Sequence, residues 1–203
     1  AYPEHGVLAE ESGPQEGSEY TWVIDPLDGT TNFLHGFPMF AVSVAAMRNG
    51  ILEHGVVYDP LRDEMFTASR GEGAQLNGKR LRVSSTRQLT PALLGTGFPF
   101  RDLSIMEPWM RSFQSLVPKT AGIRRAGAAA LDLAYVAAGR LDGFWEFGLK
   151  PWDMAAGALL IREAGGLVSD VSGDQGFIES GNLVTANPHI FEDLRKIVAR
   201  SGL

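Results

Sequence analysis

Hydrophobic and polar positions follow different patterns in the two halves of the chain. In the first half, about residues 1–100, short β-prone runs alternate with turn residues and predict strands at residues 21–24, 40–47, 51–58 and 64–69. Asn49-Gly50 and Asn77-Gly78 are dipeptides typical of tight hairpin turns. We therefore expect the first half to form an antiparallel sheet.

The second half, about residues 101–203, mixes helical and extended patterns. Spacing and composition predict helices at residues 106–117, 128–138, 151–164 and 188–200. Short apolar runs predict strands at residues 143–147, 167–169 and 183–186. This mixture indicates a layered α/β or α+β fold, and the length suits a single domain spanning residues 1–203.

The segment after the first predicted strand carries the clearest chemical signal. Asp25 and Asp28 lie three positions apart, and Pro26 and Gly29 allow a tight, rigid bend between and after them. Such a bend can bring both carboxylates and the Leu27 carbonyl into one small volume, and hard oxygen ligands of this kind suit Mg²⁺. A surface turn with no metal is equally compatible with these residues taken alone.

Further polar residues strengthen the metal hypothesis. Glu10 lies upstream of the first predicted strand, Asp153 lies in the first turn of a predicted helix, and Glu146 lies among aromatic residues of a predicted strand. An acid in a first turn can simply cap its helix, and a strand acid can point to solvent. Thr30 adds a hydroxyl group that can orient a metal-bound water. The adjacent Arg124 and Arg125 are expected to be an exposed or interface pair.

Composition narrows the class of protein. Hydrophobic residues make up 44% of the chain and charged residues 21%, which excludes a low-complexity or wholly disordered protein. The absence of cysteine excludes disulfides, a thiolate metal site and a cysteine nucleophile, and it fits a cytoplasmic location. A net charge of −6 argues against binding of nucleic acid through an extended positively charged surface. No apolar run approaches the roughly 20 residues of a membrane helix, so no membrane partner is expected.

Three collinear motifs resemble those of the inositol monophosphatase family. Residues 22–33 resemble the first signature of the family, residues 151–166 resemble the second, and residues 9–12 resemble its upstream acidic motif. Residues 55–60 and 131–139 are similar to the bacterial inositol-1-monophosphatase-like branch. The resemblance covers essentially the whole chain, in the family's order.

The resemblance implies both a fold and an activity. The implied fold is a layered αβαβα sandwich, and the outer helical layer that usually precedes the Glu10 motif is expected to be missing from this sequence. The implied activity is hydrolysis of a small phosphorylated polyol, with inositol 1-monophosphate as the expected substrate and two or three Mg²⁺ ions as cofactors. Lithium sensitivity and a homodimer are implied in the same way.

The resemblance also implies roles for individual residues. The implied metal ligands are Glu10, Asp25, Leu27 through its carbonyl, Asp28 and Asp153. The implied catalytic residues are Glu10, Asp25 and Thr30. The implied substrate-binding residues are Leu27, Asp28, Gly29, Thr30, Gly127, Ala128, Ala129, Glu146 and Asp153. Within these sets, Glu10 and Thr30 orient the attacking water, and Glu146 binds a hydroxyl group of the substrate.

Two alternatives stay open. Related phosphatases on the same scaffold act on histidinol phosphate, fructose 1,6-bisphosphate, NADP(H) or 3′-phosphoadenosine nucleotides, although residues 31–33 resemble the inositol phosphatase type more closely. Bacterial proteins of this kind can also bind the transcription machinery. A regulatory partner of a transcription protein is therefore the alternative from a different functional class.

Overall fold

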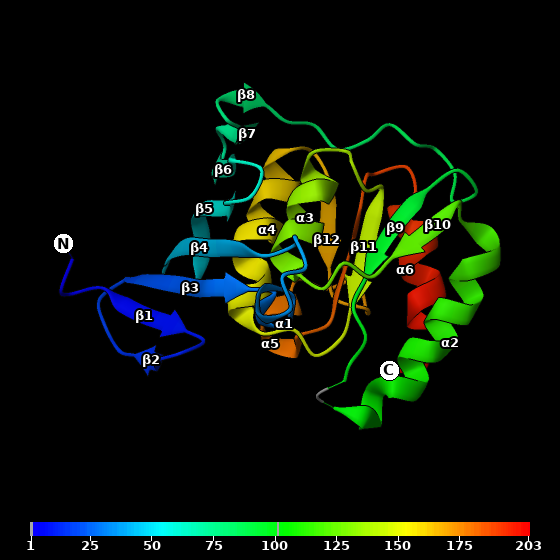
Figure 1. Ribbon diagram of the computed structural model, residues 1–203, viewed down its shortest axis with the longest axis horizontal. Helices are drawn as coiled ribbons and strands as arrows, with labels where there is room; N and C mark the ends of the chain where they lie inside the picture. Colours follow the sequence, from blue (N-terminus) through cyan, green and yellow to red (C-terminus); the bar gives the residue numbers. More distant parts are fainter. Residues whose placement is uncertain (1, 101) are drawn as a thin grey trace.

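Figure 1 shows the computed structural model, which describes residues 2–100 and 102–203. An eight-stranded sheet, a pair of helices, a five-stranded sheet and a second pair of helices lie in successive layers. The inner pair is α3 (Ala129–Ala137) and α4 (Pro151–Glu163), and the outer pair is α2 (Met106–Leu116) and α6 (Phe191–Ala199). The expected mixed α/β fold is confirmed, with these four layers of the αβαβα sandwich present.

The first sheet has the strand order β2-β1-β3-β4-β5-β6-β7-β8. Its strands are β1 (Gly6–Ala9), β2 (Gly13–Gln15), β3 (Tyr20–Asp28), β4 (Ala41–Arg48), β5 (Ile51–Asp59), β6 (Glu64–Ser69), β7 (Gly73–Leu76) and β8 (Lys79–Arg80). The four strands predicted from the sequence appear as β3 to β6. Both Asn-Gly turns are present, with Asn49 and Asn77 in the left-handed conformation that such turns require.

The expectation that this sheet is wholly antiparallel is wrong at one pair. β1 pairs with β2 in antiparallel fashion and with β3 in parallel fashion. β2 returns the chain to the beginning of β1, and β3 starts from there and runs alongside β1 in the same direction. The first sheet also ends at residue 80 rather than near residue 100, because residues 93–96 belong to the second sheet.

The second sheet has the strand order β10-β9-β11-β13-β12. Its strands are β9 (Leu93–Thr96), β10 (Gly122–Arg124), β11 (Gly143–Glu146), β12 (Leu167–Ser169) and β13 (Leu183–Ala186). β9 runs parallel to β10 and β11, whereas β13 is antiparallel to β11 and β12. The short helices α1 (Thr30–Leu34) and α5 (Phe177–Ser180) complete the fold, with 3₁₀ turns at Leu103–Ile105 and Val117–Lys119.

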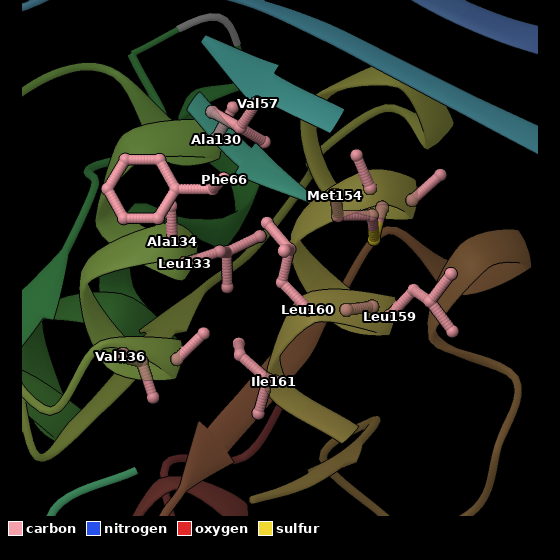
Figure 2. Close-up of a cluster of buried hydrophobic side chains, with 14 of the residues drawn as sticks. Val57, Phe66, Ala130, Leu133, Ala134, Val136, Met154, Leu159, Leu160 and Ile161 are labelled. Carbon is pink, nitrogen blue, oxygen red and sulfur yellow. The ribbon is translucent and has the colours of Figure 1, made fainter. Parts of the chain in front are cut away.

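The core lies between the sheets and is filled by α3 and α4. Figure 2 shows Leu133 of α3 pointing toward Leu160 of α4. The helices approach closely because Gly157 has no side chain: a Cβ atom there would lie 2.5 Å from the Cβ of Leu133. The same buried cluster includes Val57 and Phe66 from the first sheet, so we propose that both halves form one domain.

The helices of the described residues are short. None of them combines the length and the apolar character that crossing a bilayer requires.

Candidate metal centre

The bend at the end of β3 is built as the sequence suggests. Asp25 Oδ1 accepts a hydrogen bond from the Leu27 N–H at 2.9 Å, and the pairing of β3 with β4 shifts register between Asp25 and Asp28. Gly29 then has φ 84°, and a Cβ atom there would lie 2.8 Å from the Met39 carbonyl oxygen. Thr30 Oγ1 donates to the Leu27 carbonyl at 2.9 Å. This bend therefore points two carboxylates, a carbonyl and a hydroxyl group into a small region.

The first turns of α3 and α4 lie next to this bend and complete the site. Asp28 Oδ2 accepts a hydrogen bond from the Ala130 N–H at 2.8 Å, which ties β3 to the first turn of α3. Asp153 Oδ2 accepts from the Lys150 N–H at 2.7 Å, so Asp153 caps α4 as the simpler interpretation of the sequence suggested. It also belongs to a cluster in which one oxygen each from Asp25, Asp28 and Asp153 lies within 4.8 Å of the others.

Burying the negative charges of this cluster costs free energy in the metal-free protein. Asp25 is 1% exposed and Asp28 8% exposed. Burial raises the pKa of Asp25 from its ordinary 3.8 to about 7, opposed by the Leu27 N–H hydrogen bond and assisted by the negative charges of Glu10 and Asp153. Burial, then the charges of Asp153 and Asp25, raise the pKa of Asp28 well above its ordinary value. Buried, mutually repelling oxygen ligands fit a hard divalent cation such as Mg²⁺.

Every residue implied by the family resemblance lines one cavity of about 330 Å³. Those residues are Glu10, Asp25, Leu27, Asp28, Gly29, Thr30, Gly127, Ala128, Ala129, Glu146 and Asp153. They come from the region just after β1, the end of β3 and the start of α1, the start of α3, β11 and the start of α4. The structure thus brings all of these residues together, while their individual roles stay predictions.

Several lining residues were not identified from the sequence. Asn32 Nδ2 donates to the carbonyls of Met39 and Ala126 at 2.8 and 2.9 Å, which fastens the β3 bend to the segment before α3. Arg125 is exposed, as predicted, and it also lines the cavity with its guanidinium 4.3 Å from the centre of the Phe98 ring. Asp132 lines the cavity from α3. Of these, Asn32 lies in the first family motif and Asp132 lies in the segment 131–139 that resembles the bacterial branch, whereas Arg125 lies in no motif.

Comparison with known proteins identifies the family of this chain. The family model described as "Inositol monophosphatase family" matches residues 1–202. The chain belongs to the inositol monophosphatase family. Within that family, a protein from Pseudomonas aeruginosa named Nus factor SuhB is 62% identical over 200 residues, which cover 96% of this chain and 74% of that relative.

Solved structures of family members have the same fold. The extragenic suppressor protein suhB from Bartonella henselae superposes with a TM-score of 0.94 at 47% identity, covering 99% of this chain and 78% of that one. The inositol monophosphatase from Anabaena (Nostoc) sp. PCC 7120 has a TM-score of 0.92 at 43% identity, covering 98% of this chain and 80% of that one. The resemblance noted in the sequence is therefore confirmed at the level of family and fold.

Proposed function

We propose that this chain hydrolyses a small phosphate monoester, with inositol 1-monophosphate as the substrate. The observation that carries the proposal is the cluster of Asp25, Asp28 and Asp153, whose oxygens lie within 4.8 Å of one another and which lines a cavity large enough for a small sugar phosphate. The other residues expected from the family surround the same cavity. Membership in the family supports the reaction class, and the oxygen-rich donor set supports Mg²⁺ as the cofactor.

The ligands divide into two overlapping groups in this proposal. Glu10, Asp25 and the Leu27 carbonyl would hold one ion, and Asp25, Asp28 and Asp153 would hold a second. Bound Mg²⁺ supplies the positive charge that neutralises the phosphate dianion and an activated water at neutral pH. Asp25 belongs to both groups, so its charge is needed for the whole site.

The remaining groups of the site position water and substrate. The Thr30 hydroxyl donates a hydrogen bond to the Leu27 carbonyl oxygen. The lone pairs of the Thr30 oxygen therefore stay available to accept a hydrogen bond from water. Glu10 also lines the cavity and is the second acceptor that would orient the attacking water. The segment of Gly127, Ala128 and Ala129 lines the cavity beside the bend, where its backbone would contact the substrate.

A phosphate-release panel tests the proposed substrate. Initial rates with Mg²⁺ are compared for inositol 1-monophosphate, histidinol phosphate, fructose 1,6-bisphosphate, NADP⁺ and 3′-phosphoadenosine 5′-phosphate. We expect the highest kcat/KM for inositol 1-monophosphate. A higher kcat/KM for another compound would show that the proposed substrate is wrong while the reaction class stands. No phosphate release from any of the compounds would overturn the proposed function.

We predict that Glu146→Gln weakens the use of inositol 1-monophosphate more than that of glycerol 2-phosphate. The carboxylate of Glu146 occupies space that Gly97 leaves open, because a Cβ atom at Gly97 would lie 2.1 Å from Glu146 Oε1. Its oxygens therefore lie in the cavity, where they can accept a hydroxyl hydrogen bond from the substrate. Losing a charge-assisted hydrogen bond costs on the order of 1.5–3 kcal/mol in kcat/KM. Equal losses on both substrates would rule out selection by Glu146.

A second candidate function concerns transcription. Relatives that are 62% and 54% identical to this chain, from Pseudomonas aeruginosa and Escherichia coli, are named Nus factor SuhB. These names support binding to a transcription-machinery protein, and they are compatible with the cytoplasmic location and the homodimer predicted from the sequence. Binding to purified transcription elongation complexes that persists in Asp25→Asn would separate this role from catalysis. Absence of binding by the native chain, alone or as a dimer, would reject the role.

A further inference from the structure

A buried carboxyl group at the back of the cavity has no part in the proposed reaction. Asp132 lies in the first turn of α3, is 2% exposed and lines the cavity. Nothing in the described part of the chain donates a hydrogen bond to its carboxyl group. An acid in the first turn interacts favourably with the helix dipole, but this interaction is smaller than the cost of burying a carboxylate that accepts no hydrogen bond. The dipole therefore does not account for the burial of Asp132 in the cavity.

Two glycines, Gly95 in β9 and Gly97 just after it, lie beside Asp132 and Glu146. Gly95 and Gly97 lie two positions apart and so share one face of the extended chain. A Cβ atom at Gly97 would lie 2.1 Å from Glu146 Oε1, so the missing side chain of Gly97 leaves the space for the Glu146 carboxyl group. A Cβ atom at Gly95 would lie 3.6 Å from Asp132 Oδ1, which is an ordinary contact distance and places Asp132 beside this glycine. The cavity wall next to these glycines therefore carries two acids, Asp132 from α3 and Glu146 from β11.

The charges of this surface determine what it can bind. Burial raises the pKa of Asp132 well above its ordinary value, the negative charges of Glu146 and Asp28 add to the effect, and Arg125 opposes it. These acids offer no positive charge that could pair with a further phosphate. A neutral hydroxyl group, in contrast, donates a hydrogen bond and satisfies a buried acceptor at no cost in charge.

We propose that Asp132 is a specificity-determining residue that accepts a hydrogen bond from a hydroxyl group of the substrate, distinct from the hydroxyl bound by Glu146. The pocket then selects a leaving group that carries at least two free hydroxyl groups. This inference rests on the proposed phosphatase function and adds to it a second contact to the polyol, from α3.

The test compares Asp132→Asn with the native chain on two substrates. One is inositol 1-monophosphate, and the other is cyclohexyl phosphate, which has the same ring size and no further hydroxyl groups. We expect the ratio of the two kcat/KM values to fall about tenfold or more, mainly through KM for the inositol compound. Asp193→Asn, at an exposed aspartate of α6, is the matched control and should leave the ratio unchanged. An equal loss on both substrates would overturn the inference.

Two further measurements separate recognition from a merely structural role. Asp132→Leu removes the buried acceptor at similar size, so we expect a greater loss on inositol 1-monophosphate together with a higher Tm than that of the native chain. A lower Tm with equal loss on both substrates would indicate a structural residue. In the double variant that combines Asp132→Asn with Glu146→Gln, the two losses in kcat/KM for inositol 1-monophosphate should multiply, because each residue binds a separate hydroxyl group. A double variant no worse than Glu146→Gln alone would show that Asp132 only positions Glu146.

Binding of free inositol, followed by NMR, keeps the inference separate from the proposed reaction. If the native chain hydrolyses no phosphate ester but binds inositol in a way that Asp132→Asn weakens, the proposed reaction fails and the Asp132 contact stands. If the native chain hydrolyses inositol 1-monophosphate while Asp132→Asn changes neither the substrate ratio nor inositol binding, only the Asp132 contact fails.

Discussion

Asp25→Asn should lower kcat/KM by about 10³-fold or more while leaving the fold intact, because a site that shares one carboxylate between two metal positions loses both when that charge is removed. Asparagine has the same size, and its side-chain oxygen can still accept the Leu27 N–H hydrogen bond that shapes the bend. Phosphate release at saturating Mg²⁺ measures the loss, and thermal unfolding checks the fold.

Asp59 offers a matched control for this variant. Asp59 is also buried, is also followed by proline, and its Oδ1 accepts from the Leu61 N–H at 3.0 Å, as Asp25 Oδ1 accepts from Leu27. Asp59 lies outside the cavity and pairs with Arg62. Asp59→Asn should therefore lower stability but keep turnover per folded molecule. Near-normal turnover and Mg²⁺ dependence in Asp25→Asn would contradict its assignment as the shared metal ligand.

The free energy of unfolding of the metal-free protein should fall as the pH rises from about 4 to about 7. The pKa of Asp25 is about 7 in the folded chain against an ordinary 3.8, so the folded state binds this proton more tightly than the unfolded state. Its contribution to stability is therefore fully present below pH 4 and is lost as the pH rises through 7. A difference of about three pKa units corresponds to on the order of 4 kcal/mol, and Asp28 acts in the same direction.

Denaturation in urea at pH 5 and pH 8, with EDTA or with Mg²⁺, measures this dependence. Mg²⁺ should restore most of the stability lost at pH 8, because a cation compensates the buried carboxylates. Asp25→Asn should be more stable than the native chain in EDTA at pH 8 and should respond little to Mg²⁺. A metal-free native protein with the same stability at both pH values would refute the electrostatic cost of the site.

Local signals in the sequence were sufficient for much of the fold. The Asn-Gly turns predict the β4–β5 and β7–β8 hairpins because only a few residue types adopt the left-handed conformation that such turns need. Pro151 marks the start of α4 because proline lacks the N–H that a first helical turn leaves unpaired. The bend around Asp25 and Asp28 was also predictable, because proline and glycine constrain it within a few residues.

Short strands were the main omission. β1, β2, β9 and β10 have three or four residues each and contain glycine or proline, so no alternating pattern marks them. Their pairing depends on neighbours that are distant in sequence: β9 lies between β10 and β11 in the second sheet. The parallel pairing of β1 with β3 likewise follows from how the β2 hairpin returns the chain.

The sequence by itself determined the local chemistry of this protein: the Asp25–Asp28 bend, the acid that caps α4, and the motifs that mark its family. Only the tertiary structure decided which of these groups face one another. The approach of α3 to β11 brings Asp132 and Glu146 to the same cavity, and the absent side chain of Gly97 leaves the space for the Glu146 carboxyl group. Such contacts join residues from separate elements, and no local pattern encodes them, because burial and charge at one position depend on what the whole fold packs against it.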